Sequence, residues 1–84
     1  MSWTAFHITL NPTASVEWWY GWGDDHGAQY AQPREFTGSA RQNKLRVNYD
    51  GLFRNPDNSI WYFVNVTNEG PNMATFELVG GGLT

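Results

Sequence analysis

The sequence predicts a small all-β domain, an antiparallel β-sandwich of immunoglobulin-like type with six or seven strands. Short runs of alternating apolar and polar residues recur along the chain, and turn-forming residues separate them at the spacing that is typical of sandwiches. No window repeats apolar residues at the spacing of a helix face. The length of 84 residues allows one domain, residues 1–84.

The first predicted strands lie near the N-terminus. Trp3–Leu10 and Val16–Trp22 both alternate, and the Asn11-Pro12-Thr13 segment turns the chain between them. A third, weaker extended stretch, Ala28–Thr37, is broken by Pro33, which cannot donate a backbone hydrogen bond. The side chains predicted to point inward from the first two strands are Phe6, Ile8, Leu10, Val16, Trp18, Tyr20 and Trp22.

The second half of the chain alternates most clearly. In Lys44–Tyr49 we expect Leu45, Val47 and Tyr49 to point inward, with a turn or bulge at Asp50-Gly51. Asn55-Pro56-Asp57-Asn58 predicts a type I turn, because proline fixes φ at its second position. The last two strands complete the predicted core with Ile60, Tyr62, Val64, Val66, Ala74, Phe76 and Leu78.

Composition and charge argue against several classes of protein. The net charge is −3 and the five basic residues are scattered, so we expect no nucleic-acid partner. The chain has no cysteine and only two histidines, which predicts neither a disulfide nor a metal site, and no cofactor. The N-terminus resembles neither a signal peptide nor a membrane span, so we expect a cytoplasmic protein unless another route exports it.

The segment Tyr62–Leu78 joins an alternating strand, a Thr-Asn-x-Gly turn and an inward Ala-x-Phe pair. It resembles the late hairpin of bacterial immunoglobulin-like adhesion and repeat modules. The resemblance implies a non-catalytic spacer or binder and carries over no functional residue. The chain departs from that family in its crowded aromatic segment, Trp18–Trp22, and in its short length.

The aromatic segment and the glycine-flanked loop after it form the candidate ligand site. Aromatic rings can lie against the apolar face of a pyranose while carboxylate and amide groups bind its hydroxyls. This predicts a non-enzymatic, lectin-like module with a glycan as its ligand. The loop supplies too few ligands for calcium or zinc. The candidate ligand-binding residues are Trp18, Trp19, Trp22, Asp24, Asp25, His26 and Gln29.

Self-association is the alternative use of the surplus aromatic residues. If the alternation holds, some of them lie on the outer faces among polar neighbours, and exposed aromatic residues are enriched in subunit interfaces. A small domain without disulfides also gains stability by forming a homo-oligomer. A bulge that inverted the register would bury the same rings. The candidate interface residues are Trp3, Trp19, Trp61 and Phe63.

Catalysis has little support in the sequence. No serine lies in a nucleophile-elbow context, and no helix is expected after Gly80-Gly81-Gly82 to form a phosphate loop. Glu17 could be paired with Asp24 or Asp25, but a single small sandwich offers little room for a deep substrate cleft. We therefore expect no enzyme and assign no catalytic residue.

Overall fold

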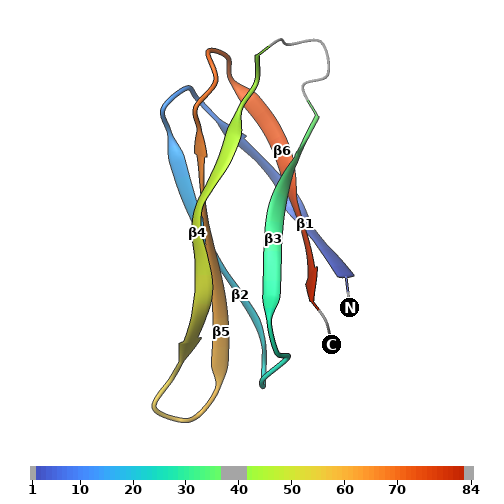
Figure 1. Cartoon of the computed structure of the whole chain (residues 1–84), viewed down its shortest axis with the longest axis vertical. Coiled ribbons are helices and arrows are strands. Elements are labelled where there is room, and N and C mark those ends of the chain that lie inside the picture. Colours follow the sequence, from blue (N-terminus) through green and yellow to red (C-terminus); the bar gives the residue numbers. More distant parts are fainter. Residues whose placement is uncertain (1, 37–41, 83–84) are drawn as a thin grey trace.

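The computed structural model describes residues 2–36 and 42–82, with the side chain of Phe6 left out. These residues form two three-stranded antiparallel sheets, β1-β6-β3 and β2-β5-β4, packed face to face (Figure 1). The predicted fold class, a small antiparallel β-sandwich, is confirmed. The predicted inward position of Phe6 and the predicted strand end at Thr37 lie outside the described residues. The six strands are β1 (Ser2–Leu10), β2 (Ser15–Gly23), β3 (Gln29–Glu35), β4 (Leu45–Arg54), β5 (Ile60–Asn68) and β6 (Ala74–Gly82).

The strand pairs are nested in sequence, so that the second pair lies within the segment enclosed by the first. β1 pairs with β6 and β2 pairs with β5, and only the β4–β5 connection joins neighbours in one sheet. The two ends of the described chain therefore lie close together, as Figure 1 shows. The last two strands lie in different sheets, whereas the last two strands of an immunoglobulin domain are neighbours in one sheet. The described residues include no helix long and apolar enough to cross a membrane.

The core lies between the sheets and confirms the predicted inward faces of β5 and β6, and of β2 as far as Tyr20. Trp22, also predicted inward, is 40% exposed, because the pairing of β2 shifts after Tyr20. β5 is the central strand of its sheet, and its side chains alternate between fully buried and partly exposed positions. Ile8, Val16, Trp18, Leu45 and Val47 pack against the core as half-buried side chains. Burial of one large aliphatic side chain stabilises the fold by about 1.5–3 kcal/mol. The buried apolar residues are Leu10, Tyr20, Ala31, Ile60, Tyr62, Val64, Val66, Ala74, Phe76 and Leu78.

Two bulges move residues to faces that the alternation did not predict. The pairing of β1 shifts by one residue between Thr4 and His7, so Trp3 packs inward against the core and not outward as expected. The pairing of β4 shifts between Val47 and Tyr49, so Tyr49 lies outward and is 49% exposed, where an inward position was expected. The strand continues through Asp50-Gly51, and the predicted irregularity occurs instead two residues earlier.

Every edge strand of the two sheets is interrupted. β1 and β4 carry the bulges described above, and the pairing of β2 shifts between Tyr20 and Gly23. β3 contains Pro33, which has no N–H to donate. None of the four edges therefore offers a continuous row of free backbone donors and acceptors to another strand.

The segment Tyr62–Leu78 is an arch between the sheets and not the hairpin that the resemblance implied, because β5 and β6 do not pair. The side chain of the buried Asn68 holds this arch in place through three hydrogen bonds. Its Nδ2 donates to the carbonyl oxygens of Leu10, at 3.0 Å, and Asn72, at 2.8 Å, while its Oδ1 accepts from the Gly70 N–H at 3.0 Å. This side chain ties the arch to the end of β1. From the Thr-Asn-x-Gly pattern alone, Asn68 is expected to be only a turn residue.

Candidate binding surface

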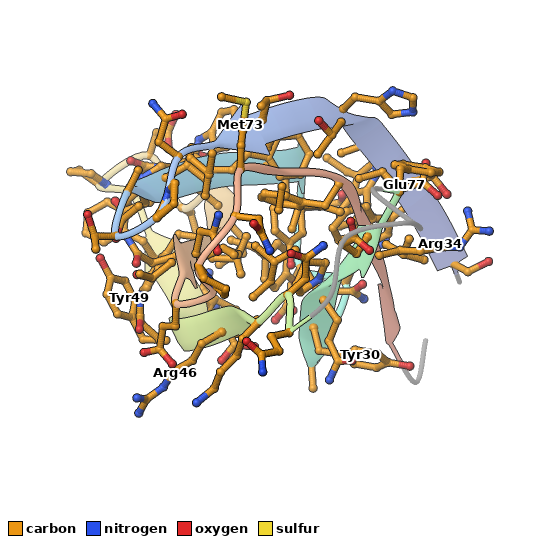
Figure 2. All side chains as sticks on the ribbon, turned by 90° about the horizontal axis from the view of Figure 1, so that it is seen from above. Tyr30, Arg34, Arg46, Tyr49, Met73 and Glu77 are labelled. Atoms are coloured by element: carbon orange, nitrogen blue, oxygen red, sulfur yellow. The ribbon has the colours of Figure 1, made fainter. Side chains whose placement is uncertain are left out.

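The two outer faces of the sandwich differ in chemistry. The face of β1-β6-β3 carries polar pairs, such as the Thr9–Thr75 hydrogen bond and the Arg34–Glu77 ion pair, both at 2.9 Å. Figure 2 shows Arg34 and Glu77 together on one side of the molecule and Tyr49 on the other. Among the described residues, the exposed aromatic side chains on the β1-β6-β3 side are Tyr30 and Phe36, whereas the face of β2-β5-β4 carries a larger group of neighbouring rings. We call this the outer aromatic face, and its rings are Trp19, Tyr49, Phe53, Trp61 and Phe63.

The strand register brings these rings into contact. Trp19 is the partner of Phe63, and Phe53 is the partner of Trp61. The Trp19 ring centroid lies 4.9 Å from that of Phe63 and 6.2 Å from that of Phe53, within the range of favourable aromatic pairs. Trp19, Phe53 and Trp61 are still 44%, 48% and 42% exposed. The rings therefore form a continuous apolar surface that is open to a partner.

Two glycines make room for the rings of Phe63 and Trp61. A Cβ at Gly51 would lie 2.6 Å from Phe63 Cζ, and a Cβ at Gly21 would lie 3.3 Å from Trp61 Cε3. Both distances are too short for ordinary packing, so the rings lie directly over the backbone of the neighbouring strands. Covering of glycine by an aromatic ring on the next strand helps to fix the strand register.

A polar row crosses the same face beside the rings. Glu17, Asn65 and Tyr49 are partners across the three strands. One Glu17 carboxylate oxygen accepts from Trp19 Nε1 at 2.9 Å, and the other accepts from the Tyr49 hydroxyl. Asn48 Nδ2 donates to Asn65 Oδ1 at 2.7 Å. Glu17 thus links the polar row to the ring of Trp19.

These hydrogen bonds affect the ionisation of both partners. The pKa of Glu17 is lowered from its ordinary value, first by the hydrogen bond from Tyr49 and then by that from Trp19, because both donors stabilise the charged carboxylate. The pKa of Tyr49 is raised, because its hydroxyl proton is held by Glu17. At neutral pH the row therefore contains an ionised carboxylate and a neutral phenol.

A cleft of about 360 Å³ continues from the outer aromatic face around the edge of β2. Residues from both sides of β2 line it, together with residues of β1 and β5. The cleft brings together Trp18, Trp19 and Trp22 from the predicted ligand-binding set, although Trp18 and Trp22 lie on the opposite side of the strand from Trp19. The full lining is Trp3, Thr4, Trp18, Trp19, Tyr20, Gly21, Trp22 and Trp61.

The polar part of the predicted ligand-binding set lies elsewhere, in the loop between β2 and β3. Asp24 Oδ1 is 3.1 Å from His26 Nε2, and Gln29 Nε2 donates to the His26 carbonyl at 2.9 Å. Asp25 Oδ1 accepts from the Gly27 N–H at 2.8 Å. These groups hold the loop together and do not line the cleft.

The loop is also attached to the core. The Tyr62 hydroxyl accepts from the His26 N–H at 3.0 Å and donates to the Gly27 carbonyl at 2.9 Å. The Trp22 ring lies 4.7 Å from the His26 ring. Within the described part of the chain, no group of three or more histidine or carboxylate side chains could hold a metal ion.

Of the predicted interface residues, Trp19, Trp61 and Phe63 lie together on the outer aromatic face. Trp3 does not, because its ring packs inward at 4.6 Å from Tyr20. Tyr49, which the alternation predicts to point inward, and Phe53 also lie on this face. Their position depends on the bulge in β4, which alternation alone does not reveal.

Comparison with known proteins gave no relative: no protein-family model, curated protein or solved structure matches the chain.

Proposed function

We propose that this chain is a non-enzymatic binding module that binds a glycan on the outer aromatic face. The observation that carries the proposal is the pairing of exposed rings with a polar row on one rigid sheet. The C–H groups on the face of a pyranose are attracted by the negative face of an aromatic ring. The sugar hydroxyls can bind the oxygens of Glu17, Asn65 and Tyr49 beside the rings.

The cleft beside β2 supports the same function. Its volume of about 360 Å³ lies near the lower end of the range of small-molecule sites, about 300–1,000 Å³. Trp19 and Trp61 belong to both the cleft and the outer aromatic face, so one extended ligand could contact both surfaces. A short saccharide chain has the length and the alternation of apolar and polar surface for this arrangement.

The state of Glu17 favours binding over catalysis. A general acid for glycoside cleavage needs a raised pKa, whereas the pKa of Glu17 is lowered by its hydrogen bonds. Both of its oxygens already accept hydrogen bonds from Trp19 and Tyr49. Such a carboxylate is a fixed acceptor and a poor proton donor.

Titration of the protein with a glycan panel, followed by tryptophan fluorescence and calorimetry, tests the proposal. We expect at least one glycan to bind, and we expect Trp19→Ala and Trp61→Ala each to weaken that binding about tenfold or more, since removal of one stacked ring is typically worth more than 1 kcal/mol. Phe36→Ala is the matched control, because Phe36 is an exposed ring on the other sheet, against His7 and Arg34. Absence of binding across the panel, or equal loss in the control, would contradict the proposal.

A homo-oligomer formed through the outer aromatic face is the second candidate. Two observations favour it: the rings form a continuous exposed apolar surface, and the interrupted edge strands leave little scope for edge-to-edge pairing. Light scattering at several protein concentrations tests it. We then expect an oligomer that Trp19→Ala or Trp61→Ala dissociates and Phe36→Ala does not. A monomer at every concentration would remove this candidate.

A further inference from the structure

Glu17 is a charged group without a positive partner. Its hydrogen-bond donors, Trp19 Nε1, the Tyr49 hydroxyl and the Asn65 side chain, are all neutral. Within residues 2–36 and 42–82, no lysine or arginine forms an ion pair with it. The described cations are engaged by other carboxylates: Arg34 by Glu77, Lys44 and Arg46 by Glu69, and Arg54 by Asp25.

The hydrogen bonds of the polar row also have a direction. Asn48 donates to Asn65, and both Trp19 and Tyr49 donate to Glu17. A carboxylate offers about four lone-pair positions, and a tyrosine oxygen that donates its proton keeps its own lone pairs. The groups left for a ligand at Glu17 and Tyr49 are therefore acceptors. A ligand that fits this row must supply donors.

We infer that the outer aromatic face selects glycans that carry free amino groups, with a sugar ammonium group bound to Glu17. This inference rests on the proposed glycan site and names its ligand class. A protonated amine supplies up to three N–H donors and the missing positive charge in one group.

Two other classes of sugar fit less well. Uronic acids and sulfated sugars bring a negative charge to an ionised carboxylate, in a chain whose net charge is already −3. An N-acetylated or plain neutral sugar can stack on the rings, but it forms no ion pair with Glu17. The order of affinity expected from the structure is therefore amino sugar, neutral sugar and acidic sugar.

Calorimetry with three β-linked oligosaccharides of equal length and linkage tests the inference. They consist of glucosamine, N-acetylglucosamine and glucose, and are measured below the pKa of the glucosamine amine. We expect the glucosamine oligomer to bind about tenfold more tightly than the other two. Added salt should reduce this preference, because it screens an exposed charge pair.

Two variants test whether Glu17 is the cause of the preference for the glucosamine oligomer. Glu17→Gln keeps the shape of the side chain and should remove the preference for the amino sugar. Glu77→Gln makes the same change in net charge on the opposite face and should retain it; circular dichroism checks that both variants are folded. Equal binding of the three oligomers, or a preference that survives Glu17→Gln, would overturn the inference and leave the glycan site standing. If no oligosaccharide of a broader panel binds, the proposed function fails, and the inference with it.

Discussion

Phe63 and Gly51 are partners on β5 and β4, and the phenyl ring of the first covers the backbone of the second. A Cβ at Gly51 would lie 2.6 Å from Phe63 Cζ and 3.1 Å from its Cε2. Phe63 in turn contacts the rings of Trp19, at 4.9 Å between centroids, and Tyr49, at 6.1 Å. The glycine therefore sets how closely the centre of the outer aromatic face approaches the sheet.

Gly51→Ala is expected to lower the free energy of unfolding by about 1–3 kcal/mol, because the new methyl group must displace the Phe63 ring. Urea denaturation followed by circular dichroism measures the change. In a Phe63→Leu background the same substitution should cost less, since the side chain that clashes is smaller and more adaptable. Costs that simply add in the double variant would contradict this relationship.

Asn68→Ala is expected to destabilise the fold by about 2–4 kcal/mol, because it leaves buried backbone groups of Leu10 and Gly70 without their hydrogen-bond partner and removes the bond to the Asn72 carbonyl. Thermal or urea unfolding measures the loss. Asn48→Ala is the control, because Asn48 forms its side-chain hydrogen bonds on the exposed face. Similar losses in the two variants would mean that burial of Asn68 is not what matters.

Val64→Asp is expected to prevent folding. Val64 is fully buried on the central strand β5, where a carboxylate would have neither water nor a positive partner. Phe53→Asp, on the outer face of β4 and 48% exposed, should leave the protein folded, because an exposed charge stays hydrated. Soluble expression and circular dichroism compare the two. A folded Val64→Asp protein would show that the inner and outer faces are assigned the wrong way round.

The titration of Glu17 is expected below its ordinary value of 4.5, because Tyr49 and Trp19 stabilise the carboxylate. A carboxyl group whose pKa is depressed by folding stabilises the fold above its unfolded pKa, and this contribution is lost as the pH falls through the lower, folded value. Stability should therefore decrease on acidification across that window. Carbon-detected NMR of the side-chain carboxyl groups gives the titration directly.

In Tyr49→Phe, the midpoint of Glu17 should move up towards the ordinary value, because the largest cause of the shift has been removed. Asp57 provides an internal control. Its pKa is lowered by hydrogen bonds from Ser59 in the β4–β5 turn, which Tyr49 does not contact, so its midpoint should stay unchanged. An unchanged Glu17 midpoint would contradict the role of the Tyr49 hydroxyl.

Alternation predicted the core well where a strand lies in the middle of its sheet. The inward set of β5 is correct throughout, because a central strand is held on both sides and keeps its register. Trp3 and Tyr49 were placed on the wrong faces because an extra residue in β1 and in β4 inverts the alternation. Such a bulge leaves no clear mark in the pattern of apolar residues.

The candidate surface could be predicted only in part. Trp19, Trp61 and Phe63 are adjacent because β2 pairs with β5, and the sequence does not reveal which strands pair. For the same reason the role of Glu17, which depends on a tyrosine two strands away, was not visible. The Asp24–His26 loop was predicted as a loop, but its polar groups bind one another and the core, and do not join the aromatic rings.

The interrupted edge strands have a consequence for the protein in concentrated solution. A strand of another folded molecule extends a sheet most easily where the edge offers a long unbroken row of backbone donors and acceptors, and a bulge or a proline shortens that row at every edge. The chain can thus display an exposed aromatic surface while its sheet edges disfavour edge-to-edge pairing of folded molecules. Self-association of the folded chain would then proceed through side chains of the outer aromatic face and not through shared backbone hydrogen bonds.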